Sequence, residues 1–126
     1  MPFVRIDLLR GKDSSYRSKL GQAVYDALSS IGAPEHDRFQ VIAEHDTDGL
    51  IFDRTYLGID RGDNFVSVQI TFNEGRTLDQ KKALYKAIVK NMGDSVGMRP
   101  QDVFVNLVET KKENWSFGNG EAQYAL

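Results

Sequence analysis

The chain has 126 residues, of which 40% are apolar and 27% are charged, and its net charge is -2 at pH 7. This size and balance predict one soluble globular domain with a substantial hydrophobic core. No basic patch with interleaved aromatic residues stands out, so nucleic acid is not an expected partner. No membrane association is expected either, because no apolar run approaches the about 20 residues that span a bilayer and no signal-peptide pattern opens the chain.

The chain contains no cysteine and only two histidines, His36 and His45. The lack of cysteine excludes disulfides, thiol nucleophiles and Cys-ligated metals, and it fits a cytoplasmic location. The two histidines lack metal-ligand spacing, so neither a metal site nor a serine–histidine triad is expected. We interpret His45 as a surface or structural residue.

Proline stands at position 2, directly after the initiator methionine. Inside a chain a proline nitrogen is neither a base nor a nucleophile, because it is part of an amide without an N–H. If Met1 is removed, that nitrogen becomes an amine that titrates near neutrality, where acid–base catalysts work best. Pro2 is therefore a candidate catalyst, although many chains begin this way for no chemical reason.

The first half of the chain predicts a strand, a helix and a second strand. Apolar alternation marks residues 3–9 as a strand that Gly11 ends. An N-cap candidate at Asp13 begins a helix with an apolar stripe, and Gly32 stops it. Residues 38–45 then have the composition of a second strand.

The second half predicts the same order of elements. Residues 65–72 alternate as a strand. Thr77, followed three residues later by Gln80, is typical of a capping box at the start of a helix that Gly97 ends. Residues 102–109 predict the last strand.

The two halves, about residues 2–62 and 63–126, form an internal repeat. Two βαβ units joined in tandem predict one α+β domain, with a four-stranded sheet and both helices on one face. Matching positions lie 64 or 65 residues apart and pair Val4 with Val68, Gly11 with Gly75, Asp37 with Asp102 and Phe39 with Phe104.

Such a sheet leaves one face without helices. The strands carry apolar residues at consecutive as well as alternate positions, as in Phe3-Val4, so the second face is expected to be partly apolar. The chain offers no third layer to cover it. We therefore expect an oligomer, arranged as a closed ring of subunits.

Two motifs of the second half, taken with Pro2, resemble the tautomerase superfamily, the group of 4-oxalocrotonate tautomerase. Residues 74–82 read EGRTLDQKK after a strand, and residues 113–124 read ENWSFGNGEAQY after the last one. The doubled length and the repeat are similar to its fused, trimeric branch, which includes malonate semialdehyde decarboxylase and the 3-chloroacrylate dehalogenases. The resemblance implies a cofactor-free enzyme, a small-molecule carboxylate substrate and a homotrimer.

The resemblance also implies roles for individual residues. Pro2 would be the general acid or base, and Arg76 would bind a substrate carboxylate through two parallel hydrogen bonds. Asp37 matches an aspartate that acts beside the proline, although an aspartate before a strand also caps turns. Trp115 and Phe117 would line an apolar wall near Pro2, unless they serve only as core residues.

Two departures from the family pattern bear on the site. Lys12 stands at the position that corresponds to Arg76, and Val66 corresponds to Pro2. Because Val66 is internal, one site per chain is expected. Glu74 stands where decarboxylase-like members carry an arginine, which weakens the case for a second substrate carboxylate.

Three functions remain open at this point. The leading hypothesis is a tautomerase that ketonises enols of small 2-oxo acids, with neutral Pro2 as the base. The first alternative is a malonate semialdehyde decarboxylase or hydratase in which Pro2 stays protonated or forms an iminium. The second alternative is a binding or signalling trimer without physiological turnover.

Overall fold

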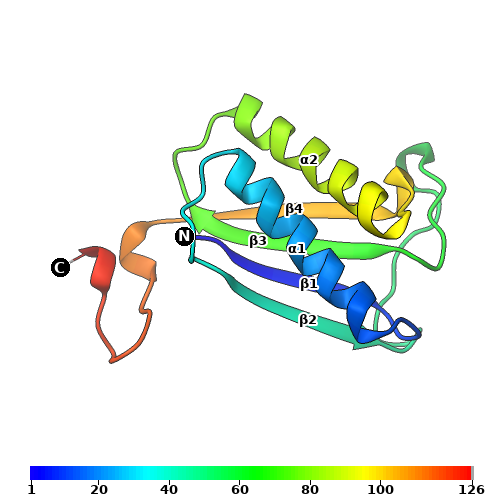
Figure 1. The fold of residues 1–126 in the computed structure, drawn as a ribbon, viewed down its shortest axis with the longest axis horizontal. Helices are drawn as coiled ribbons and strands as arrows, with labels where there is room; N and C mark the ends of the chain where they lie inside the picture. Colours follow the sequence, from blue (N-terminus) through cyan, green and yellow to red (C-terminus); the bar gives the residue numbers. More distant parts are fainter. Residues whose placement is uncertain (126) are drawn as a thin grey trace.

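A single four-stranded sheet carries two helices on one face in the computed structural model, which describes residues 1–125 (Figure 1). The elements follow the predicted order, and three of the four strands begin one residue later than the sequence pattern indicated. Their bounds are β1 Phe3–Leu9, α1 Ser14–Ser30, β2 Phe39–His45, β3 Val66–Asn73, α2 Leu78–Val96 and β4 Val103–Thr110.

The sheet order is β2-β1-β3-β4. Within each half the strands are parallel, β1 with β2 and β3 with β4, as a βαβ crossover requires. The halves meet where β1 and β3 pair antiparallel, so that Phe3 lies opposite Thr71 and Leu8 opposite Val66. One end of the sheet therefore gathers the starts of β1 and β2 with the ends of β3 and β4.

The helix ends follow local sequence signals. Asp13 accepts a hydrogen bond from the amide of Tyr16 as the N-cap of α1. Thr77 and Gln80 form the reciprocal capping box of α2. Gly97 ends α2 in the left-handed conformation, at φ 70°, which glycine adopts without steric cost.

The core lies between the sheet and the helices. Alternate residues of the two central strands, β1 and β3, point into the core. Because of this, apolar residues recur at every second position in the sequence of both strands. The largest fully buried side chains include Ile6, Leu20, Ile70, Phe72, Leu84, Ile88 and Met92.

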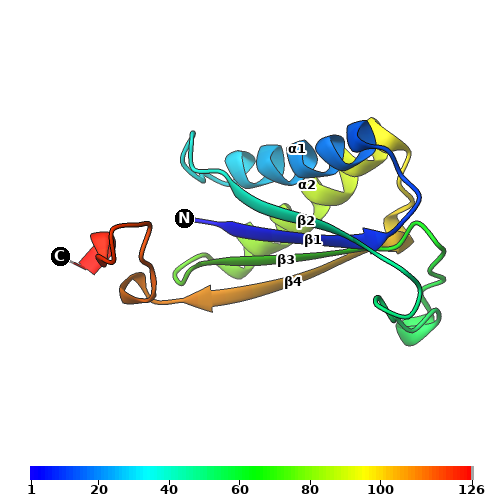
Figure 2. The same ribbon diagram turned by 90° about the horizontal axis from the view of Figure 1, so that it is seen from below.

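The other face of the sheet carries no helix (Figure 2). Exposed apolar side chains lie on this face at the start of β1 and along the two edge strands, β2 and β4. This agrees with the partly apolar second face expected from the sequence. This uncovered face includes Phe3, Phe39, Val41, Phe104 and Val108.

The segments that follow β2 and β4 lie at opposite ends of the sheet (Figures 1 and 2). The segment after β4 extends beyond the end where the N-terminus lies, and the segment between β2 and β3 lies at the other end. Within residues 1–125, no helix is long and apolar enough to cross a membrane.

Candidate active site

The register of the sheet brings the distant candidate residues to one end. Pro2 directly precedes β1 and is buried. Phe3 pairs with Phe39 on one side and with Thr71 on the other. Asp37, which precedes β2, and the turn that follows β3 therefore both lie near the N-terminus.

The terminal amine, here carried by Met1, lies in a charged and partly dry environment. Its nitrogen is 3.8 Å from Oδ2 of Asp37, and both side chains are largely buried. Burial lowers the pKa of this amine below its ordinary value. The negative charge of Asp37 opposes the fall in pKa, while the positive charges of Arg76 and Lys112 add to it.

Arg76 lies in the turn between β3 and α2 and is half-buried. Its guanidinium carbon is 4.5 Å from the centroid of the Phe72 ring, a cation–π contact that holds the planar group in place. Nη1 donates a long hydrogen bond of 3.4 Å to the carbonyl of Asn73. Burial lowers the pKa of Arg76 and the charge of Glu109 opposes this, so the group is a partly desolvated cation suited to an anionic ligand.

Trp115 and Phe117 belong to an aromatic cluster in the segment after β4. The indole N–H of Trp115 donates to Oδ1 of Asn73 at 2.8 Å, which fixes the ring beside the end of β3. Phe117 stacks on Trp115 at 5.6 Å between ring centroids, and Tyr124 meets Phe117 edge-on at 4.7 Å. Burial and the charge of Asp37 raise the pKa of Tyr124, which places the cluster at the same end as Asp37.

Two cavities lie at this end of the sheet, and only the smaller one is lined by candidate catalytic residues. Pro2 and Asp37 line a space of about 10 Å³ on the helix side, which has room for no more than a water molecule. An open pocket of about 520 Å³ lies between the end of β3 and the segment after β4, and its walls include Asn73, Glu74 and Lys112. Only the second is large enough for a small organic acid.

Lys12 and His45 lie away from this end of the sheet. Lys12, the counterpart of Arg76, follows β1 at the opposite end of the sheet and lies over the ring of Tyr16. His45 forms a contact of 2.6 Å with Asp7 on the uncovered face, in keeping with a structural role.

Sequence reasoning missed Asn73, Lys112 and Tyr124. Asn73 could have been noticed because it directly precedes the EGR motif, at the end of a strand. Lys112 carries no such signal, and Tyr124 ends the ENWSFGNGEAQY motif without standing out within it. The path of the segment after β4 brings both to this end.

Comparisons with known proteins agree with this architecture. Two family models, both described as "Tautomerase enzyme", match residues 37–118 and residues 2–58. The chain is 38% identical over 124 residues to the probable tautomerase YusQ of Bacillus subtilis (strain 168), covering 98% of both chains.

Two solved structures share the fold over nearly the whole chain. FG41 malonate semialdehyde decarboxylase, inhibited by 3-bromopropiolate, matches with a TM-score of 0.90 and 33% identity, over 97% of this chain and 93% of the other. The Q0 fused 4-OT, a symmetric trimer, matches with a TM-score of 0.77 and 26% identity over 98% of both chains.

Proposed function

The chain belongs to the tautomerase family of enzymes, and we propose that it moves a proton between the enol and keto forms of small 2-oxo acids. The amine of Pro2, exposed by removal of Met1, would be the acid–base group, and Arg76 would bind the substrate carboxylate. The observation that carries this proposal is the terminal amine itself. In this structure the terminal nitrogen is that of Met1, which is partly buried and lies 3.8 Å from Oδ2 of Asp37. The Pro2 nitrogen follows it by one residue, directly before β1.

The proposed reaction needs only this one titrating group. Neutral Pro2 takes the proton from the enol hydroxyl while the C=O bond forms, and the protonated amine then delivers a proton to the adjacent carbon. Arg76 holds the carboxylate through two N–H groups, so that the reacting carbon stays beside the amine. The Trp115–Phe117–Tyr124 cluster supplies an apolar wall that limits the access of water.

The charges around the amine set the pH at which it works. Burial, Arg76 and Lys112 lower the pKa of the Met1 amine. We expect the same surroundings to lower the pKa of the Pro2 amine, which keeps a larger fraction of it neutral at a given pH. Asp37 acts in the opposite direction and would stabilise the protonated intermediate of the transfer. Asp37 is therefore proposed as a group that tunes Pro2 rather than as a second base.

Asp37→Asn is expected to move the ascending limb of the pH dependence of kcat/KM to lower pH. The substitution removes a negative charge that raises the amine pKa, so the neutral base becomes available at lower pH. Asp94→Asn is the matched control, because Asp94 pairs with Lys90 on the exposed face of α2. A limb that stays in place or moves to higher pH would contradict this role for Asp37.

A second candidate function is malonate semialdehyde decarboxylation or hydration. The 0.90 TM-score and 33% identity with FG41 malonate semialdehyde decarboxylase favour it. In that reaction Pro2 would act in its protonated form, as an acid, or would form an iminium with the aldehyde. Glu74 counts against it, because this carboxylate replaces a cation of the decarboxylase-like pattern at the edge of the open pocket.

A substrate panel separates the two functions. Phenylenolpyruvate, 2-hydroxymuconate and malonate semialdehyde are each tested over a range of pH with the wild-type enzyme and with Pro2→Ala. The tautomerase proposal predicts turnover of at least one enol, with a rate that rises with pH through the pKa of the amine. Turnover of malonate semialdehyde alone, with a rate that falls as pH rises, would favour the decarboxylase.

We further propose a homotrimer in which the uncovered face packs against neighbouring subunits. Its exposed apolar side chains and the symmetric trimer of the Q0 fused 4-OT support this assembly.

Val41→Asp, on the uncovered face, is expected to convert the trimer to a species near the chain mass of 14.2 kDa. A carboxylate buried at a subunit interface without a partner opposes assembly. Light scattering coupled to size exclusion measures the mass, and Lys86→Asp on the exposed face of α2 is the control. If Val41→Asp and Lys86→Asp both remain trimeric, this face is not the interface.

A further inference from the structure

A third cavity, a pocket of about 280 Å³, lies at the end of the sheet opposite Pro2. It is bordered by the segment between β2 and β3 and by the paired starts of β3 and β4. Pro2, by contrast, precedes β1, which begins beside the end of β3. The walls of this pocket include Phe52, Tyr56, Arg61 and Phe65 of the segment between β2 and β3. Phe104 also lines it and belongs to the uncovered face that we propose as the subunit interface.

The internal repeat explains where this pocket lies. Phe52 stands 65 residues before Phe117, and Phe104 stands 65 residues after Phe39. The pocket thus occupies the position that corresponds to the Pro2 end of the sheet in the other half of the chain. The residue that corresponds to Pro2 in the second half is Val66, which lies inside the chain. This pocket therefore has no terminal amine. Its expected role is binding rather than proton transfer.

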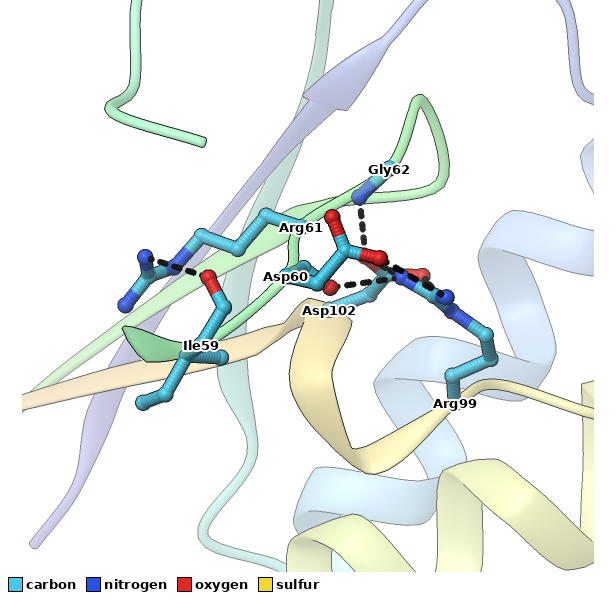
Figure 3. Close-up of polar contacts among 6 residues, drawn as sticks. All are labelled: Ile59, Asp60, Arg61, Gly62, Arg99 and Asp102. Atoms are coloured by element: carbon cyan, nitrogen blue, oxygen red, sulfur yellow. Dashed lines mark hydrogen bonds and ion pairs between the residues drawn. The ribbon is translucent and has the colours of Figure 1, made fainter. Parts of the chain in front are cut away.

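The walls of the pocket are held by a network of polar contacts (Figure 3). Asp102, which is 2% exposed, accepts hydrogen bonds from the amide of Gly62 at 2.7 Å and from Nε of Arg99 at 3.2 Å. Arg99 in turn donates to the carbonyl of Asp60. Nη1 of Arg61 donates to three carbonyl oxygens of the same segment, those of Asp53, Tyr56 and Ile59. These contacts fix the segment in advance, which lowers the entropic cost of binding a ligand.

The aromatic side chains fit a flat ring. Phe52 and Phe65 stack at 4.1 Å between centroids, and Phe104 is tilted against Phe65 at 6.0 Å. Apolar contacts of this kind favour stacked or edge-on aromatic ligands. A volume of 280 Å³ accommodates a single ring with a short substituent, since an engineered cavity of about 150 Å³ already binds benzene.

The polar side chains of the pocket favour an acidic substituent. Within residues 1–125, Nε and Nη2 of Arg61 donate to no other group, so both can reach a ligand oxygen. The carboxylate of Asp53 also borders the pocket, and its Oδ1 accepts from the amide and the hydroxyl of Thr55. Asp53 keeps its negative charge, which offsets part of the attraction of Arg61 for an anion. Arg61 is the cation on the pocket wall, and a guanidinium binds a carboxylate in a planar, two-pronged fashion.

We propose that this pocket is a non-catalytic binding site for small aromatic monocarboxylates, separate from the Pro2 site and recognised through Arg61. The site does not depend on Pro2. Its occupancy can therefore be tested whether or not the proposed tautomerase reaction is correct.

The test is a titration of the full-length protein with benzoate and with its neutral analogue benzamide, followed by amide NMR. Pro2→Ala is titrated in parallel to remove any contribution that depends on the catalytic amine. Arg61→Gln tests the carboxylate partner. Ser67→Leu fills the pocket from β3, opposite Phe104 in the register, while leaving Arg61 in place. Enol turnover of the Arg61 and Ser67 variants, or their NMR dispersion, shows that they are folded. Light scattering shows that they keep the mass of the wild type, a control that is needed because Ser67 lies on the uncovered face.

The proposal predicts saturable shifts of the amides of Phe52, Phe65 and Phe104 with benzoate, equal in wild type and Pro2→Ala. Benzamide is expected to bind at least about tenfold more weakly, because it lacks the charge that strengthens hydrogen bonds to a guanidinium. Arg61→Gln should weaken the binding of benzoate by about the same factor. Folded Ser67→Leu should abolish the amide shifts that benzoate causes. Equal affinities for benzoate and benzamide, or shifts confined to residues near Asp37 and Arg76, would overturn the proposal.

Discussion

Pro2→Ala is expected to lower kcat/KM for enol ketonisation by about 10²- to 10⁴-fold, the usual contribution of a positioned general acid or base. The pyrrolidine ring fixes the direction of the nitrogen lone pair, whereas a terminal alanine carries a primary amine that rotates. The ring also lies in a buried site at the start of β1, so its loss changes both the solvation and the position of the base. Steady-state kinetics with phenylenolpyruvate measure the effect.

Two controls make this result specific to the amine. Intact mass spectrometry of each preparation establishes whether Met1 has been removed, because retained Met1 turns the Pro2 nitrogen into an amide. Circular dichroism and the oligomeric mass establish that the variant is folded and assembled. If folded Pro2→Ala ketonises the enol within about threefold of wild type, far less than a lost general base should cost, the catalytic role of Pro2 fails.

Arg76→Ala is expected to lower kcat/KM by about 10²-fold, since a partly desolvated, charge-assisted contact to the substrate carboxylate is lost. The effect should fall largely on KM if Arg76 binds the carboxylate equally in the ground and transition states. Arg76→Lys keeps the charge but loses the planar pair of N–H groups, so we expect an intermediate activity.

Lys12→Ala is the matched control for Arg76→Ala. Lys12 is the counterpart of Arg76 in the repeat, and it lies over Tyr16 much as Arg76 lies over Phe72. It stands at the opposite end of the sheet, however, and its loss should leave kcat/KM unchanged. Equal losses in Arg76→Ala and Lys12→Ala would indicate a general effect of charge rather than a contact with substrate.

The fold could be predicted from the sequence because its signals are local. Alternation with a period of two located the two central strands, and composition and the repeat located the edge strands, each to within about one residue. The Thr77–Gln80 pair marked the start of α2. The repeat then fixed the order of elements, and the right-handed crossover rule placed both helices on one face.

The site could be predicted only in part, because it depends on the antiparallel pairing of β1 with β3. That pairing sets Phe3 opposite Thr71 and so brings Asn73 and Arg76 to the N-terminus, which no local pattern reveals. Motifs singled out Pro2 and Arg76 as candidates. Lys112 and Tyr124 were missed because the segment after β4 has no periodic structure, and its path is set by contacts such as that of Trp115 with Asn73.

The surroundings of Asp37 and Asp102, at opposite ends of the sheet, also depend on contacts between distant parts of the chain. The repeat pairs Asp37 with Asp102, yet the two carboxylates have different surroundings. Asp37 lies beside the terminal amine, whereas Asp102 is enclosed by Arg99 and Gly62. For Asp37 the sequence left a catalytic role and a turn-capping role open, and only the contacts distinguish Asp37 from Asp102.

The most direct test of the account is a ¹⁵N NMR titration of the protein labelled at proline nitrogen. Burial lowers the pKa of the Met1 amine, and a free Pro2 amine at the same end of the sheet is expected to share that environment. We therefore predict an amine resonance of Pro2 that titrates with a pKa below the ordinary range for a terminal amine. The same pKa should appear as the midpoint of the ascending limb of kcat/KM. A Pro2 nitrogen that does not titrate, or one whose pKa differs from that midpoint, would contradict the claim that this amine is the catalytic base.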